Sequence, residues 1–290
     1  MRTNSELCII ECPRDAMQGL NYFIPTESKV FYIDLLLKCG FDVLDVGSFV
    51  SRRAIPQMRD TAEVLNRIEI SSCSTELLTI VANIRGAESA VQFDQISYLG
   101  YPFSISETFQ KRNTNKSIEE SYRLLDEIYS IANRGNKEVV LYLSMAFGNP
   151  YGDEWNNELV HYWIDQLHQR FDPSIISLSD TIGCADKERI SVLFGELIHS
   201  FDSVEFGAHL HVRPEEAKLL LDAAYKAGCR RFDTAMRGYG GCPMANDDLT
   251  GNMPSEQLLE WLIQNNIVNN INVSSFEMAI DSVNKVFNNL

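Results

Sequence analysis

The chain has 290 residues, with 25 Lys and Arg against 40 Asp and Glu, which gives a formal net charge of −15. This charge disfavours non-specific binding to nucleic acid, which needs a basic surface. The sequence holds no apolar run of the roughly 18 residues that a membrane span needs, and residues 1–6 lack the apolar core of a secretory signal. We therefore expect a cytoplasmic protein that acts on a small molecule, with neither nucleic acid nor a membrane as a partner.

The seven cysteines are an odd number without CxxC spacing, so we expect reduced thiols rather than a disulfide framework. Three basic pairs, at residues 52–53, 111–112 and 230–231, offer local positive charge. Screening at physiological salt limits the acidic field of the whole chain to about 8 Å, so such a pair can still bind an anion. Taken singly, each pair is expected to be a solvated surface feature.

Strand and helix patterns alternate along the chain. Apolar runs predict strands at residues 7–12, 41–46, 77–82, 95–99, 139–145, 175–178, 204–209 and 230–236. Periodicity and capping signals predict helices at 28–39, 61–70, 86–93, 117–133, 157–170, 187–200, 214–227, 254–264 and 276–287. Eight strand–helix repeats indicate an α/β fold, a (β/α)8 TIM barrel forming one domain over residues 1–290 with an extra C-terminal helix. A doubly wound open sheet is the alternative.

Two histidines, His209 and His211, stand at the end of the apolar run 204–208. Residues two apart on a strand share a face, so both imidazoles are expected to point the same way. In a TIM barrel, the C-terminal end of the strands is where active sites are built. The pair is therefore a candidate metal clamp; the alternative is two polar side chains that only form hydrogen bonds.

Asp15 follows the first predicted strand and is a candidate third ligand. One carboxylate and two imidazoles leave positions open for substrate or water, as a catalytic metal site requires. This mixed oxygen and nitrogen set favours Mg²⁺ or Mn²⁺ over Zn²⁺. The alternative for Asp15 is a helix N-cap or an ion pair with Arg14.

The loop after the eighth predicted strand reads GYGGC over residues 238–242. So many glycines are compatible with a mobile lid that carries the thiol of Cys242. A thiol acts as a general acid or base only when its pKa is moved towards neutral. The alternative is a glycine-rich turn with an incidental cysteine.

With these motifs in order, the chain resembles the HMG-CoA lyase branch of the DRE-TIM metallolyases from Glu11 to about Leu259. The segments that carry the resemblance are ECPRD (11–15), SFVS (48–51), IPQM (55–58), NKSIEES (115–121), SLSDTIG (177–183), HLH (209–211), DT (233–234), GYGGCP (238–243) and GN (251–252).

The resemblance implies a divalent cation held by four side chains, which correspond here to Asp15, His209, His211 and Asn252. It also implies catalytic roles for five residues, corresponding to Arg14, Cys242, His209, Asp45 and Asp180. In such enzymes the arginine stabilises an enolate and the lid cysteine transfers a proton. The position of Asp45 is usually glutamate in this family.

The implied reaction is a retro-aldol, Claisen-type cleavage of 3-hydroxy-3-methylglutaryl-CoA to acetoacetate and acetyl-CoA, with His209 or Asp45 as the base. Family members often form homodimers, and the C-terminal helix offers an interface.

The chain departs from the family at Asp45 and at residues 212–215 (VRPE), where DTYG is usual. Two alternatives therefore stay open. One is a related aldolase or condensing enzyme acting on another 3-hydroxyacyl-CoA or 2-oxo acid, with Arg213 meeting an extra carboxylate. The other is a non-catalytic barrel.

Overall fold

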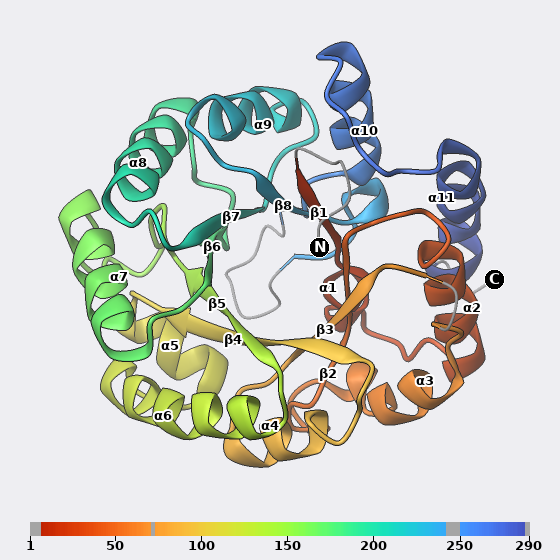
Figure 1. Ribbon diagram of the computed structural model, residues 1–290, viewed down its shortest axis with the longest axis horizontal. Coiled ribbons are helices and arrows are strands. Elements are labelled where there is room, and N and C mark those ends of the chain that lie inside the picture. Colours follow the sequence, from red (N-terminus) through yellow and green to blue (C-terminus); the bar gives the residue numbers. More distant parts are fainter. Residues whose placement is uncertain (1–6, 71–72, 242–249, 288–290) are drawn as a thin grey trace.

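The computed structural model describes residues 7–70, 73–241 and 250–287. Its centre is a closed barrel of parallel strands in the order β1 to β8, surrounded by helices (Figure 1). The strands are β1 (Cys8–Glu11), β2 (Val43–Ser48), β3 (Glu76–Ile80), β4 (Ile96–Ser104), β5 (Glu138–Ser144), β6 (Ile175–Asp180), β7 (Glu205–Leu210) and β8 (Arg231–Thr234). The closed order confirms the predicted TIM barrel and excludes the open sheet.

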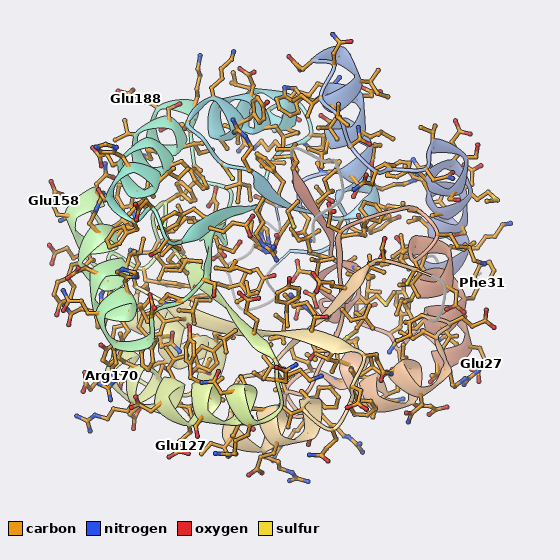
Figure 2. All side chains as sticks on the ribbon, viewed as in Figure 1. Glu27, Phe31, Glu127, Glu158, Arg170 and Glu188 are labelled. Carbon is orange, nitrogen blue, oxygen red and sulfur yellow. The ribbon has the colours of Figure 1, made fainter. Side chains whose placement is uncertain are left out.

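Most of the helices form a layer around the barrel, whereas α1 (Pro13–Gln18) lies beside β1 (Figure 1). The other helices are α2 (Thr26–Leu36), α3 (Thr61–Arg67), α4 (Ile84–Ala90), α5 (Glu107–Thr114), α6 (Ile118–Arg134), α7 (Asn157–Phe171), α8 (Lys187–Ser200), α9 (Ala217–Lys226), α10 (Ser255–Gln264) and α11 (Val273–Phe287), with short 3-10 turns η1 (Pro56–Met58) and η2 (Met236–Gly238). Charged side chains such as Glu127, Glu158 and Glu188 point outward from this layer (Figure 2). Within the described part of the chain, no helix combines the length and apolarity needed to cross a membrane.

Strand alternation separates the barrel interior from the packing layer under the helices. On β1, Cys8 and Ile10 belong to the interior cluster, whereas Ile9 belongs to the cluster that packs against the helices. Both faces are therefore buried, which explains why the strands read as nearly continuous apolar runs. The barrel closes where β1 pairs with β8, with Cys8 opposite Arg231 and Glu11 opposite Thr234.

The predicted C-terminal helix is present as α11 and packs against α2. The ring of Phe287 meets that of Tyr32 edge-on with centroids 5.6 Å apart, and the rings of Phe276 and Phe41 lie 6.2 Å apart. These aromatic contacts place the helix beside the start of the barrel, where it completes the outer layer.

Two helices and one buried charge depart from the sequence prediction. Helices α1 and α5 were not predicted, because α1 has six residues and α5 buries only Phe109 and Gln110 of its mostly polar sequence. Arg231 belongs to a predicted surface pair but is 1% exposed, so that expectation is wrong for it. Its guanidinium lies inside the barrel, 3.6 Å from a carboxylate oxygen of Glu205, because β8 alternation points it inward.

Candidate active site

The two histidines lie at the C-terminal end of β7. His209 is within the strand and His211 follows it, and both side chains are buried, with ring centroids 5.4 Å apart. Strand alternation turns both imidazoles towards the barrel axis. The edge of Tyr142 from β5 packs against His209 at a centroid distance of 5.5 Å.

Asp15 reaches the histidines from α1, which begins directly after β1. One ligand atom each from Asp15, His209 and His211 can be chosen so that all three lie within 4.8 Å of one another. His211 Nε2 lies 3.8 Å from Asp15 Oδ2 and has no hydrogen-bond partner among the described residues, although it is buried. A buried polar atom without a partner is costly, and a cation in this position would satisfy it. The residues therefore fit a divalent ion.

Asn252 is brought to the same place by the segment before α10. Val212 N donates to Gly251 O (2.8 Å), and His211 forms an antiparallel bridge with Asn252. This segment therefore pairs with the residues that directly follow β7. The Asn252 amide nitrogen donates to Asp15 Oδ2 (2.7 Å) and to Tyr239 O (2.9 Å). Its amide oxygen is then the atom left to contact a cation.

The charges of these residues suit cation binding. Although burial raises the pKa of Asp15, Arg14 and both histidines lower it to about 2, so the carboxylate is ionised near neutral pH. Burial and the neighbouring His209 lower the pKa of His211 to about 4, which leaves a neutral imidazole able to act as a ligand. Metal ligands must be deprotonated, and both side chains meet that condition.

Arg14 joins Asp15 to Asp45 at the end of β2. Its Nε and one terminal nitrogen donate to Asp45 Oδ2 at 2.9 and 2.6 Å, and the other terminal nitrogen donates to Asp15 Oδ1 at 2.7 Å. A guanidinium has five N–H groups, so each terminal nitrogen keeps one donor. The β2–β3 register shifts between Asp45 and Gly47, an irregularity of the kind that re-aims side chains near active sites.

Asp45 is buried and differs electrostatically from Asp15. Burial raises its pKa to about 6, against the lowering effect of Arg14. Its Oδ1 has no hydrogen-bond partner among the described residues.

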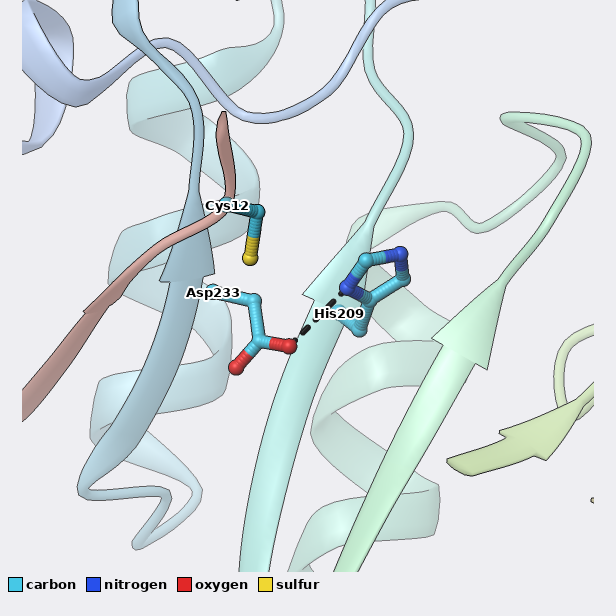
Figure 3. Close-up of side chains that lie close together, drawn as sticks. All are labelled: Cys12, His209 and Asp233. Atoms are coloured by element: carbon cyan, nitrogen blue, oxygen red, sulfur yellow. Dashed lines mark hydrogen bonds and ion pairs between the residues drawn. The ribbon is translucent and has the colours of Figure 1, made fainter. Parts of the chain in front are cut away.

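A further carboxylate, Asp233 on β8, contacts His209 (Figure 3). Asp233 Oδ2 lies 2.9 Å from His209 Nδ1, and Cys12 lies beside both residues. These three could form a second cation site, but burial raises the pKa of Cys12 well above its ordinary value and keeps it a neutral thiol. The role of Asp233 was not predicted from the sequence; the signal for it is that β7 and β8 place His209 directly opposite Asp233.

Asp180, a predicted catalytic residue, does not take part in this cluster. The Asp180 carboxylate accepts hydrogen bonds from the backbone nitrogens of Cys184 (3.0 Å) and Ala185 (2.7 Å), which shape the turn after β6. Cys242 lies outside the described residues, so its role stays a prediction. Arg213, the predicted partner of an extra carboxylate, is exposed and does not line the central cavity described below.

A cavity of about 380 Å³ opens above these residues. Arg14, Asp15, His209 and His211 line its inner part, and Phe109, Arg112 and Lys116 line it from α5 and the following loop. This volume lies in the range of small-molecule sites. Neither Asp45 nor Asp180 is among the described residues that line it.

The sequence of the chain matches that of a known protein family. The HMGL-like family model matches residues 8–283. The chain is 31% identical over 267 residues to hydroxymethylglutaryl-CoA lyase YngG of Bacillus subtilis (strain 168), covering 92% of this chain and 88% of that protein. It is also 31% identical over 255 residues to the cytoplasmic 3-hydroxy-3-methylglutaryl-CoA lyase of Rattus norvegicus, covering 86% of this chain and 72% of the relative.

Solved structures of HMG-CoA lyases have the same fold as this chain. The crystal structure of the Bacillus subtilis HMG-CoA lyase matches with a TM-score of 0.90 and 30% identity, covering 98% of this chain and 95% of that chain. An HMG-CoA lyase from Acinetobacter baumannii in complex with coenzyme A and 3-methylmalate matches with a TM-score of 0.89 and 26% identity, covering 99% and 93%. The chain therefore belongs to the HMGL-like family and is an HMG-CoA lyase-like enzyme.

Proposed function

We propose that this enzyme cleaves 3-hydroxy-3-methylglutaryl-CoA to acetoacetate and acetyl-CoA. The observation that carries the proposal is the convergence of Asp15, His209 and His211 in one cavity, with the Arg14 guanidinium beside them. The relatives named as lyases of this thioester support the choice of substrate. A structural relative that binds coenzyme A supports an acyl-CoA ligand.

Asp15, His209, His211 and Asn252 would hold the cation. The donor set of one carboxylate, one amide oxygen and two imidazoles favours Mg²⁺ or Mn²⁺. When bound, such a cation supplies Lewis acidity that polarises substrate oxygens.

His209 is the base that the geometry favours. Asp233 occupies Nδ1, so Nε2 is the nitrogen left to face the cavity, and the residue lines that cavity whereas Asp45 does not. Burial opposes protonation of His209, but the hydrogen bond and charge of Asp233 raise its pKa overall. Because Nε2 has one lone pair, it takes the proton of the tertiary hydroxyl only when it is not bound to the cation. Asp15, His211 and Asn252 would then hold the ion, and Asp233 would stabilise the imidazolium that forms.

Arg14 supplies positive charge where the enolate of acetyl-CoA develops. Its contacts with Asp15 and Asp45 fix the guanidinium in place, and its two remaining donors can meet the enolate oxygen. Cys242 is proposed as the proton donor to the enolate carbon, as the family resemblance implies. The homodimer and the role of Asp180 also stay predictions.

The test is direct. Purified enzyme with Mg²⁺ or Mn²⁺ and 3-hydroxy-3-methylglutaryl-CoA should release acetoacetate, and His211→Ala should abolish the release while His199→Ala, on the exposed face of α8, should not. Cation binding without turnover of this substrate would contradict the proposal and favour another 3-hydroxyacyl-CoA or a 2-oxo acid.

A further inference from the structure

A second cavity, of about 520 Å³, lies between the loop after β2 and helices α3 and α4. Four arginines line it: Arg52 and Arg53 in that loop, Arg59 after η1, and Arg85 in the first turn of α4. We call this cavity the arginine cleft. None of its described lining residues is acidic, in a chain whose formal net charge is −15.

The positive charge of the cleft is not neutralised by neighbouring carboxylates. All four arginines are exposed, and none takes part in an ion pair of the described residues. Arg59 instead stacks on the ring of Phe23, with its guanidinium carbon 3.7 Å from the ring centroid. By contrast, three other surface arginines, Arg67, Arg123 and Arg170, each pair with a carboxylate.

Small polar groups complete the lining. Ser51 and Asn83 add a hydroxyl and an amide nitrogen to the lining, whereas the hydroxyls of Thr61 and Ser89 already donate to backbone carbonyls. Arginines bind phosphate through paired N–H donors, and hydroxyl groups add further hydrogen bonds. The lining therefore favours an oxyanion with several acceptor oxygens over an apolar ligand.

The arginine cleft adjoins the active-site cavity. Ser48, Val50, Ser51 and Asn83 line both cavities. A ligand with an anionic end in the cleft can therefore extend along the loop after β2 towards the candidate cation ligands.

We propose that the arginine cleft binds the phosphate groups of a small molecule. Two sources offer this chemistry: the nucleotide end of a CoA thioester whose acyl end lies in the active-site cavity, and a separate phosphorylated metabolite that binds beside the site. The first source rests on the proposed function; binding of phosphate groups as such does not.

Adenosine 3′,5′-bisphosphate is a suitable probe, and isothermal titration measures its dissociation constant with the whole enzyme. Removing two charge-assisted contacts in the double variant Arg52→Gln/Arg53→Gln should weaken binding about tenfold or more. Arg85→Gln, on a different element, should also weaken it. The matched double variant Arg123→Gln/Arg134→Gln on the exposed face of α6 removes the same charge and should leave the dissociation constant unchanged.

Raising the salt concentration should weaken binding to the wild type, because exposed charges are screened. Failure of the wild type to bind the probe at millimolar concentration would overturn the proposal. Equal dissociation constants for the cleft variants and the α6 control would overturn it as well.

Kinetics with two substrates identify the source. If the nucleotide end of the substrate occupies the cleft, Arg52→Gln/Arg53→Gln should raise KM for the CoA thioester far more than for the pantetheine thioester. If a separate metabolite occupies it, the two thioesters should respond alike while probe binding is still weakened. The titration with adenosine 3′,5′-bisphosphate needs no turnover. It therefore tests phosphate binding even if the enzyme does not cleave 3-hydroxy-3-methylglutaryl-CoA.

Discussion

Asp233 on β8 lies directly opposite His209 on β7, with its Oδ2 2.9 Å from His209 Nδ1. A carboxylate that holds one ring nitrogen fixes the orientation and tautomer of the imidazole and raises the basicity of the other nitrogen. This pairing leaves Nε2 of His209 on the side of the ring away from Asp233 (Figure 3), and His209 lines the cavity.

Asp233→Asn keeps the size of the side chain but removes its charge and its preference for accepting a hydrogen bond. Because outer partners of metal-binding histidines typically affect affinity by 10–100-fold, we expect Mn²⁺ binding to weaken by about that factor. Isothermal titration measures this, with Asp222→Asn, a half-buried residue of α9 that pairs with Lys226, as the control. Equal Mn²⁺ affinities of Asp233→Asn and the wild type would show that the pairing does not position His209.

Arg14→Lys keeps a positive charge but cannot bridge Asp15 and Asp45 with a planar fork. Loss of a donor aimed at a developing oxyanion typically costs about 10²–10³ in kcat, and we expect a fall in that range with 3-hydroxy-3-methylglutaryl-CoA. Arg170→Lys is a matched control, since Arg170 also contacts one carboxylate, that of Asp126, through two nitrogens, but on the surface. A kcat for Arg14→Lys within a factor of two of the control would exclude this role for the guanidinium.

Gly240 allows the loop after β8 to pass close to the candidate cation ligands. Its φ is +106°, and a Cβ at this position would lie 2.8 Å from Asp15 O and would also clash with the Asn252 side chain. Gly240→Ala should therefore cost about 1–3 kcal/mol in backbone strain and weaken Mn²⁺ binding.

Gly195→Ala provides the contrast, because a Cβ there meets no atom within 4 Å and the residue lies inside α8. It should stabilise the protein by about 0.5–1 kcal/mol and leave Mn²⁺ affinity unchanged. Urea unfolding and isothermal titration test both variants. Unchanged Mn²⁺ affinity in Gly240→Ala would show that the loop does not constrain the site.

Glu11 makes stability depend on pH. Burial raises its pKa from 4.5 to about 8, although its oxygens accept from Met236 N (2.8 Å) and contact Ser255 and Thr234. The folded state therefore binds a proton that the unfolded state has released between these two pH values. This contribution to stability is fully present below pH 4.5 and is lost as pH rises towards 8, by up to about 1.4 kcal/mol per pH unit.

Glu11→Gln removes the titration while keeping an acceptor for Met236 N. The free energy of unfolding of the wild type, relative to that of the variant, should fall from pH 5 to pH 8, as urea unfolding at several pH values would show. Glu127→Gln on the exposed face of α6 should show no such trend. A constant difference between wild type and Glu11→Gln across this range would contradict the assignment.

The strands and the shared face of the histidines could be predicted because their signals are local. An apolar run needs both faces buried, and residues two apart on a strand always share a face. The polar sequence of α5 carries no comparable periodicity, since only Phe109 and Gln110 of that helix are buried.

The contacts between strands could not be predicted in this way. The Asp233–His209 pair depends on the β7–β8 register. The Arg14–Asp45 contact depends on how α1 packs against β2, next to the irregular β2–β3 register. The burial of Arg231 depends on closure of the barrel, which sets which face of β8 is inside. Each is fixed by the packing of distant segments rather than by neighbouring residues.

Binding of Mn²⁺ to the purified enzyme tests the central claim, that Asp15, His209, His211 and Asn252 converge on one cation. The account predicts one ion per chain by isothermal titration, with an affinity about 100-fold or more weaker in His211→Ala and unchanged in His199→Ala. Absence of binding to the wild type, or equal affinities of wild type and His211→Ala, would contradict it.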